Sequence, residues 1–408
     1  MADVQAGIGP FLGVFLIAHG WQSGPIGSVM TIGGVAGMMM TAPAGAFIDE
    51  TKRKRTCVIV LGICTVLASM IILVSQVFWL VALSQVATAV AGAAIGPALD
   101  AITLGIVRQA GFNRQNGYNQ ALNHASNLVG AGLSGWLGWM FGLTAVFGLA
   151  AVFGLLSIVS VLMIPHEAID DDEARGAAHA AIASKGITKS AEQRKPSGFG
   201  VLADSKPLLL LAGALALFHL GNGAMLPLFG LAVVSAKQGD PAGFVALTIV
   251  VAQGTMIITS LIAMHVAERR GQWLVLLISF IALPVRGFVA AYLITSWGVY
   301  PVQFLDGVGA GLQSVAVPAL VAHILNGTGR INVGQGVVMT VQGVGASLSP
   351  AIGGWLAQEI GYSAMFMILG SFAFGSIALW IGFHGVLRAA ASVPGHSAPR
   401  RPVDLVAD

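Results

Sequence analysis

Long apolar segments recur along the whole chain and restrict its fold more than any other feature of the sequence. A membrane-spanning helix needs about 20 apolar residues. Such segments occur at twelve places: residues 3–19, 25–48, 56–77, 79–107, 117–141, 143–164, 207–235, 241–267, 273–294, 298–324, 333–358 and 362–387. Only 9% of the residues are charged, whereas a soluble domain carries about 25%. The sequence therefore predicts an all-α integral membrane protein with twelve transmembrane helices.

The positions of the basic residues predict how these helices are oriented. Eighteen of the 20 Lys and Arg residues fall in alternate connections, in a central polar segment or after the last apolar segment. The two exceptions are Lys237, in an opposite loop, and Arg286, inside an apolar segment. Loops rich in Lys and Arg stay on the cytoplasmic side of a membrane. We therefore expect a multi-pass protein of the bacterial inner membrane with both termini in the cytoplasm.

The chain is predicted to consist of two repeated halves. Shifting the sequence by 219 residues places nine identical residues within 24 positions, beginning with Gly135-Trp136 on Gly354-Trp355. Residues 165–206 between the halves are polar and charged. Six spans in each half give both copies the same orientation, a plan in which the site lies near the midplane. We expect six-helix bundles at 1–164 and 207–388, related by a pseudo-two-fold axis, with a cytoplasmic linker at 165–206 and a tail at 389–408.

The repeat also predicts that the first helix is truncated. Pro10 corresponds approximately to Pro227, but only nine residues precede Pro10, whereas the apolar segment around Pro227 begins about twenty residues earlier. We expect the native start to lie upstream of Met1. Asp3 would then lie within the membrane and could bind a proton or a cationic substrate; if Met1 is the start, Asp3 is a surface acid.

A charged loop follows the second apolar segment. It reads Gly45-Ala-Phe-Ile-Asp49-Glu-Thr-Lys-Arg53-Lys54-Arg55, with a weaker copy at Glu268-Arg269-Arg270-Gly271. This loop resembles the signature loop of the major facilitator superfamily, although Lys52 replaces the usual second Gly and Glu50 the usual Arg. The resemblance implies a monomeric transporter in which the loop is a conformational gate. The expected gating residues are Gly45, Asp49, Arg53, Lys54, Asp100, Glu268 and Arg269; alternatively, the bases only set the topology.

Two departures from the family pattern concern its drug/proton antiporters. Their fifth span carries a Gly-Pro element, but this chain has Ala131 at that place and a proline at Pro350, in the other half. Their fourth span carries an arginine, whereas Gln85 lies in that region here. Both differences weaken an assignment to that subgroup.

Arg286 and Asp306 are predicted to lie deep in the membrane. Counted from the ends of their apolar segments, both lie roughly 10–13 Å deep at 1.5 Å per residue. An ionisable residue at that depth is costly and needs a partner or a function. Two interpretations remain open: a structural ion pair between Arg286 and Asp306, or a role for Asp306 in coupling transport to protons.

Amide side chains form polar stripes along two repeat-related helices, one in each half. Polar faces within a membrane must point toward protein or a water-filled path. We therefore predict a hydrated cavity between the halves, with interhelical hydrogen bonding as the alternative. The expected substrate and proton pathway contains Asp3, Gln5, Asn119, Asn123, Asn127, His219, Asn222, Gln253, Asp306, Gln335 and Gln342.

These features favour a secondary transporter of a small organic solute, with proton-coupled efflux preferred because no densely charged site suits a charged nutrient. A proton-coupled symporter that imports a metabolite is the alternative; a membrane enzyme, a channel or a sensor is a further one. The sequence has no phosphate-binding loop and no paired Cys or His-Glu-x-x-His motif. We therefore expect no catalytic residues, no cofactor, no metal and no nucleic-acid partner; the expected partners are substrate, protons and membrane lipid.

Overall fold

The computed structural model describes residues 11–170, 205–238, 240–325 and 331–391, and within them the chain is helical. After a first helical segment at 11–18, the longer helices follow closely on one another along the chain. They are α2 (Ser23–Glu50), α3 (Lys54–Val74), α4 (Phe78–Phe141), α5 (Leu143–Leu162), α8 (Lys206–Asn222), α9 (Met225–Ser235), α10 (Pro241–Arg270), α11 (Gln272–Tyr292), α12 (Val299–Ile324), α13 (Ile331–Ile360), α14 (Tyr362–Gly382) and α15 (His384–Ala391). Short 3-10 turns lie at His166–Ala168 and Ser296–Gly298.

Many of these helices have the length and composition of membrane spans. Within the described residues, nine segments qualify: Lys54–Val74, Phe78–Arg108, Leu143–Leu162, Lys206–Ser235, Pro241–Ala267, Gln272–Tyr292, Ser296–Ile324, Gly334–Ile360 and Tyr362–Gly382. The predicted spans at 25–48 and 117–141 are helical as well, within α2 and α4. The protein is therefore an all-helical, multi-pass membrane protein.

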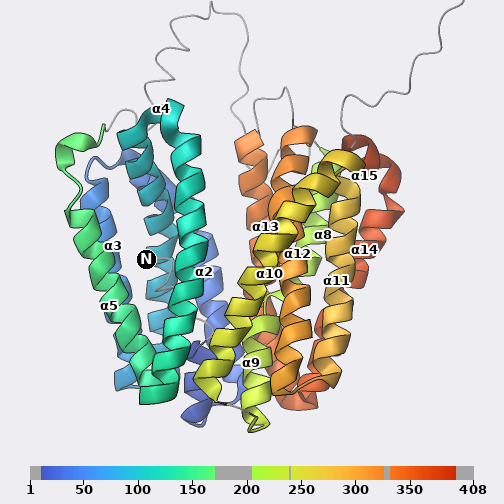
Figure 1. Ribbon diagram of the computed structural model, residues 1–408, viewed down its shortest axis with the longest axis horizontal. Coiled ribbons are helices and arrows are strands. Elements are labelled where there is room, and N and C mark those ends of the chain that lie inside the picture. Colours follow the sequence, from blue (N-terminus) through green and yellow to red (C-terminus); the bar gives the residue numbers. More distant parts are fainter. Residues whose placement is uncertain (1–10, 171–204, 239, 326–330, 392–408) are drawn as a thin grey trace, which may run out of the picture.

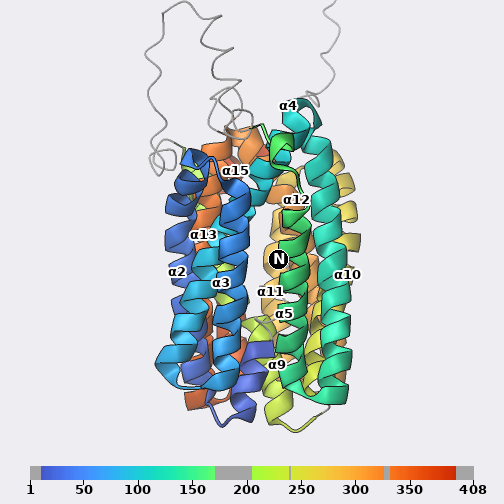
Figure 2. The ribbon, with the colours of Figure 1, turned by 90° about the vertical axis from the view of Figure 1, so that its left-hand side faces the viewer.

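The helices gather into two groups that stand side by side (Figure 1). The N-terminal group contains α2 to α5, and the C-terminal group contains α8 to α15. In the N-terminal group, α3 and α5 cover the side turned away from the other group (Figure 2). Each group has its own aromatic contacts, such as Phe15 with Phe147 at 5.0 Å between ring centroids and Phe280 with Trp380 at 5.4 Å.

Two predicted features differ from the structure in detail. The connection expected between residues 107 and 117 is helical except at Arg108, whose φ of 56° and ψ of 175° interrupt α4. The predicted span at 207–235 is divided into α8 and α9, which are separated by Gly223 and Ala224. The start of the chain and most of the linker, on which the expected truncation and linker structure depend, lie outside the described residues.

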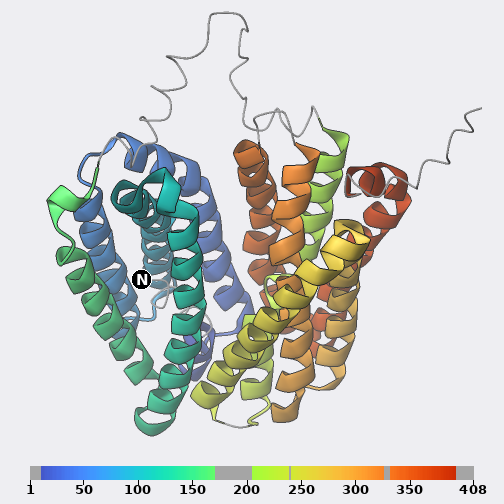
Figure 3. The same cartoon turned by 45° about the horizontal axis from the view of Figure 1, so that its top comes forward.

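Among the described residues, the contacts between the two groups lie toward one end. We call the end that carries the exposed side chains of Arg53, Arg108, Arg269 and Arg270 the basic end, and the opposite end the far end. At the far end, α2 packs on α13 so closely that a Cβ added to Gly27 would lie 1.9 Å from the Pro350 carbonyl oxygen. Toward the basic end the groups diverge (Figure 3).

Hydrogen bonds hold the far end closed. Ser23 Oγ lies 2.7 Å from Tyr362 Oη, the Ala351 amide donates to Thr31 Oγ1 at 2.9 Å, and Trp355 Nε1 donates to Ser28 Oγ at 3.0 Å. Toward the basic end, the same two helices have open space at Gly45 and Gly336, where an added Cβ would meet nothing within 4 Å. The structure is therefore a conformation closed at the far end and open toward the basic end.

Candidate functional site

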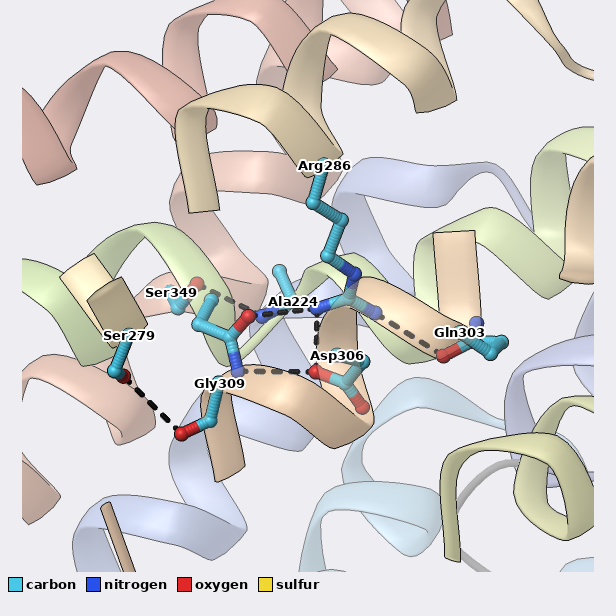
Figure 4. A network of polar contacts seen from close by, with 8 residues as sticks. Ala224, Ser279, Arg286, Gln303, Asp306, Gly309 and Ser349 are labelled. Carbon is cyan, nitrogen blue, oxygen red and sulfur yellow. Dashed lines mark hydrogen bonds and ion pairs between the residues drawn. The ribbon is translucent and has the colours of Figure 1, made fainter. Parts of the chain in front are cut away.

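A buried ion pair links two helices of the C-terminal group, and Figure 4 shows it with its polar neighbours. Arg286 Nη1, from α11, lies 2.7 Å from Asp306 Oδ1 on α12. The same Nη1 donates to Asn222 Oδ1 at 2.6 Å, and Asn222 Nδ2 donates to Asp306 Oδ1 at 3.4 Å. Three helices thus place one cation, one anion and one amide in mutual contact.

The two charged side chains differ in their access to solvent. The Arg286 side chain is 1% exposed, whereas that of Asp306 is 13% exposed. Arg286 Nη2 also donates to Gln303 Oε1 at 3.2 Å, and Gln303 is fully buried. A buried charge is tolerated only when it is paired and hydrogen-bonded. Arg286 is therefore fixed in place, while Asp306 is the member that is partly exposed to solvent.

A second polar chain continues along α12 toward the basic end. Gln313 Nε2 donates to Ser279 Oγ at 2.8 Å, and Ser279 Oγ donates to the Gly309 carbonyl at 3.1 Å. The His219 side chain lies close enough to Gln313 and Asp306 to interact electrostatically with both. His219 and Asn222 thus lie in one polar network around Asp306. Sequence reasoning missed Gln303, Gln313 and Ser279, although their polarity within apolar segments was a usable signal.

The division between α8 and α9 positions Asn222. Helix α8 ends at Asn222, and the Ala224 amide at the break donates to Ser349 Oγ of α13 at 2.9 Å. Broken helices that expose backbone groups occur at the sites of membrane transporters. The sequence signal for this break is Gly221-Asn222-Gly223, in which two glycines flank the amide.

Glycines bring α10 next to the ion pair. A Cβ added to Gly307 would lie 2.5 Å from Thr255 Cβ and 2.6 Å from the Ala252 carbonyl oxygen. This close approach places Asp306, the neighbour of Gly307, at the depth of Gln253. Gln253 is half-buried, and its Oε1 has no hydrogen-bond partner within the described part of the chain.

The amides of the N-terminal group lie along the second half of α4. Gln115 Nε2 donates to Asn119 Oδ1 at 3.1 Å, and Asn119 Nδ2 donates to Thr103 Oγ1 at 3.4 Å. Asn123 and Asn127 are half-buried. Asn119 is therefore tied into its own group, whereas the two later amides lie nearer the far-end contact with α10.

The amides of α13 belong to the C-terminal group. Gln335 Nε2 donates to the Pro318 carbonyl oxygen at 3.4 Å, and Gln342 is half-buried. Gln342 precedes Gly343, where an added Cβ would lie 3.9 Å from Met38 Cγ of α2. Gln342 therefore lies where contact between the two groups ends. Asp3 and Gln5 fall outside the described residues.

The predicted gating residues lie at the basic end. Lys54 is buried, with 1% exposure, and its Nζ donates to the carbonyl oxygen of Thr51, the residue that caps α2, at 2.8 Å. Arg53, Asp100 and Arg269 are exposed. Gly45 lies within α2, and the helices α2 and α10 carry positions 49 and 268 near their basic ends. The side chains at 49 and 268 are outside the described set.

The described residues contain no group of three or more His, Cys, Asp or Glu side chains placed to hold a metal ion. The polar groups that converge at mid-depth are instead amides, hydroxyls and the ion pair. Such a set can bind a polar organic molecule by hydrogen bonds.

The matching family profile and the matching relatives point to the same family of transporters. The sequence profile described as Major Facilitator Superfamily matches residues 3–332 and 213–404. Two curated relatives, both called uncharacterized MFS-type transporters and from two strains of Mycobacterium tuberculosis, are each 35% identical over 382 residues, covering 93% of this chain and 90% of the relative.

Solved structures share the fold at low sequence identity. A crystal structure of a point mutant of the nucleoside transporter NupG has a TM-score of 0.74 and 13% identity, covering 94% of this chain and 95% of that one. A second NupG structure has a TM-score of 0.71 and 15% identity, covering 95% and 99%.

Proposed function

Because the chain belongs to the major facilitator superfamily, we propose that it is a proton-coupled exporter of a small organic solute that works by alternating access. Twelve spans would form two six-helix bundles, 1–164 and 207–388, in the bacterial inner membrane with both termini cytoplasmic. The basic end would then face the cytoplasm. The protein would act as a monomer within the lipid.

One observation carries this proposal. The two helix groups are closed at the far end and diverge toward the basic end, and the polar network around Asp306 lies at mid-depth beside the helices where that contact stops. In this conformation a solute would reach such a polar site from the basic end and not from the far end. Rocking of the groups would move the opening to the other side while the site stays in place.

Asp306 is the proposed coupling group. In this conformation its carboxylate neutralises the buried Arg286. Protonation of Asp306 removes that negative charge, so Arg286 retains only its neutral partners Asn222 and Gln303. The polar network then lacks its ion pair, so the relative stability of the two conformations of the transporter changes. Substrate and proton would compete because both act on the same carboxylate and its amide partner.

The test is a ligand screen by thermal unfolding at about pH 6 and about pH 8, since a ligand stabilises the folded state in proportion to its occupancy. The panel contains hydrophobic cations, amines, sugars, amino acids and nucleosides, the last because NupG, which shares the fold, is a nucleoside transporter. If proton and substrate compete, the stabilising ligand acts more strongly at pH 8. Asp306→Asn should remove that difference between the two pH values.

A ligand that acts more strongly at pH 6 contradicts antiport and supports the importing symporter. Asn222→Ala is the matched control, because it alters a partner of Asp306 without removing the titrating group. It should weaken ligand binding but leave the pH difference. If Asp306→Asn keeps the full pH difference, the proton acts elsewhere.

A further inference from the structure

Three buried amide oxygens lack a hydrogen-bond partner within the described residues; one, Gln272 Oε1, lies at the start of α11, and the other two lie on opposite helix groups. Asn127 Oδ1, on α4, and Gln253 Oε1, on α10, are both buried and have no hydrogen-bond partner among the residues that the structure describes. An unsatisfied buried acceptor is costly, and native proteins retain few of them. These two oxygens therefore need an explanation beyond packing.

The register of α4 on α10, extended from their contact at the far end, pairs Asn127 with Gln253. A Cβ added to Gly138 would lie 2.4 Å from Ala242 Cβ, and one added to Gly135 would lie 2.3 Å from Ala246 Cβ. The two helices are antiparallel here, so moving back along α4 corresponds to moving forward along α10. Three turns back from Gly138 along α4 is Asn127, and three turns on from Ala242 along α10 is Gln253, on the same faces.

The two amides also share the depth of the ion pair. Ala252 and Thr255 of α10 approach Gly307 of α12. Gln253 lies between them in sequence, and Asp306 precedes Gly307. The helix register thus places the amide pair at the level of the polar network, with one amide contributed by each helix group.

We propose that Asn127 and Gln253 form a two-sided clamp for a solute that carries at least two hydrogen-bond donors. One N–H or O–H of the solute would bind Asn127 Oδ1, and another would bind Gln253 Oε1. A bound solute would thereby tie the two helix groups together at the depth of Asp306. This inference rests on the proposed transport function and adds the substrate class: polyols, amides and amines rather than donor-free hydrophobic molecules.

The first test needs no ligand. Asn127→Leu and Gln253→Met replace each amide with an apolar side chain of similar size, which removes an unsatisfied polar group. Both variants should unfold at the same temperature as the wild type or higher. The control is Asn222→Leu, because the Asn222 amide is already hydrogen-bonded to Arg286 and Asp306. That variant should unfold at a lower temperature.

The second test uses defined probes: myo-inositol, putrescine and uridine, each compared with its permethylated analogue. At least one parent compound should raise the unfolding temperature of the wild type, and its methylated analogue should not. Loss of one acceptor should weaken binding of that compound roughly tenfold. Asn127→Ala and Gln253→Ala provide smaller replacements should the larger ones disturb packing.

Several results would overturn the clamp. One is a lower unfolding temperature in both Asn127→Leu and Gln253→Met. Another is equal stabilisation by parent and methylated compounds, or by none of the three parents. Unchanged affinity in both variants, with wild-type transport intact, removes the clamp but leaves the proposed function. Loss of affinity in both variants without any proton-driven transport by the wild type supports the clamp and contradicts proton coupling.

Discussion

Arg286→Met is expected to destabilise the protein by about 3–5 kcal/mol, the usual result of removing one partner of a buried ion pair. The Arg286 side chain is 1% exposed and has Asp306, Asn222 and Gln303 as partners. Methionine keeps most of the volume but leaves the Asp306 carboxylate without its cation. Chemical unfolding in detergent, followed by helical circular dichroism, measures the loss.

The matched control is the double variant Arg286→Met, Asp306→Leu. Removing both charges replaces the ion pair with apolar packing, which is often neutral or stabilising. The double variant should therefore recover most of the lost stability, although it should not couple transport to protons. A double variant as unstable as Arg286→Met alone would mean that the packing of Arg286, and not its charge, holds α11 and α12 together.

Gly27→Val is expected to disfavour the conformation that is closed at the far end. A Cβ on Gly27 would lie 1.9 Å from the Pro350 carbonyl oxygen, so α2 and α13 cannot keep their far-end contact. Overpacking against backbone at a close contact costs about 3 kcal/mol, which is roughly a hundredfold change in the population of this conformation. Transport should stop, because a transporter that cannot close its far end cannot complete its cycle.

Spin labels measure that shift directly. Gln22 and Glu359 are exposed at the far ends of α2 and α13, so cysteines there can carry labels once Cys57 and Cys64 are replaced by serine. The distance between the labels should lengthen in Gly27→Val. Gly148→Val is the control, because a Cβ at Gly148 meets nothing within 4 Å, and its distance should match the wild type. An unchanged distance in Gly27→Val would contradict the tight contact.

The antiparallel register of α2 and α13 also predicts the effect of a substitution at the basic end. Gly34 approaches Ser347, and three turns further along α2 and back along α13 the register pairs Gly45 with Gly336. Valine at Gly336 has open space now but would meet α2 once the basic end closes. Gly336→Val should therefore keep the far-end distance short while blocking transport.

Much of the architecture follows from composition and charge, because lipid permits few alternatives for long apolar segments. The helical, multi-pass character and the family were predictable from residue patterns such as the loop after Gly45. The depths of Arg286 and Asp306 could be counted from segment ends, since helix rise is constant. Their mutual orientation required the structure, because facing side chains depend on how α11 and α12 rotate.

Other features of the site were harder to predict from the sequence. The break at Gly223–Ala224 was hidden because the residues around it are apolar enough to continue a span. The turn at Arg108 was also unpredictable in detail, since a positive φ at a residue with a side chain is uncommon. Whether an amide oxygen is hydrogen-bonded within the described residues, as that of Asn119 is and that of Asn127 is not, depends on distances between helices that the local sequence does not encode.

Proton-driven export through Asp306 is tested by solute accumulation in proteoliposomes under an imposed pH gradient. The probe is the compound that stabilises the wild type most in the thermal screen. Antiport predicts accumulation when the lumen is acidic, in either orientation of the protein, and loss of accumulation with a protonophore. Asp306→Asn should abolish driven accumulation while retaining exchange of labelled for unlabelled solute. Accumulation only with an alkaline lumen, or full driven accumulation by Asp306→Asn, would contradict the account.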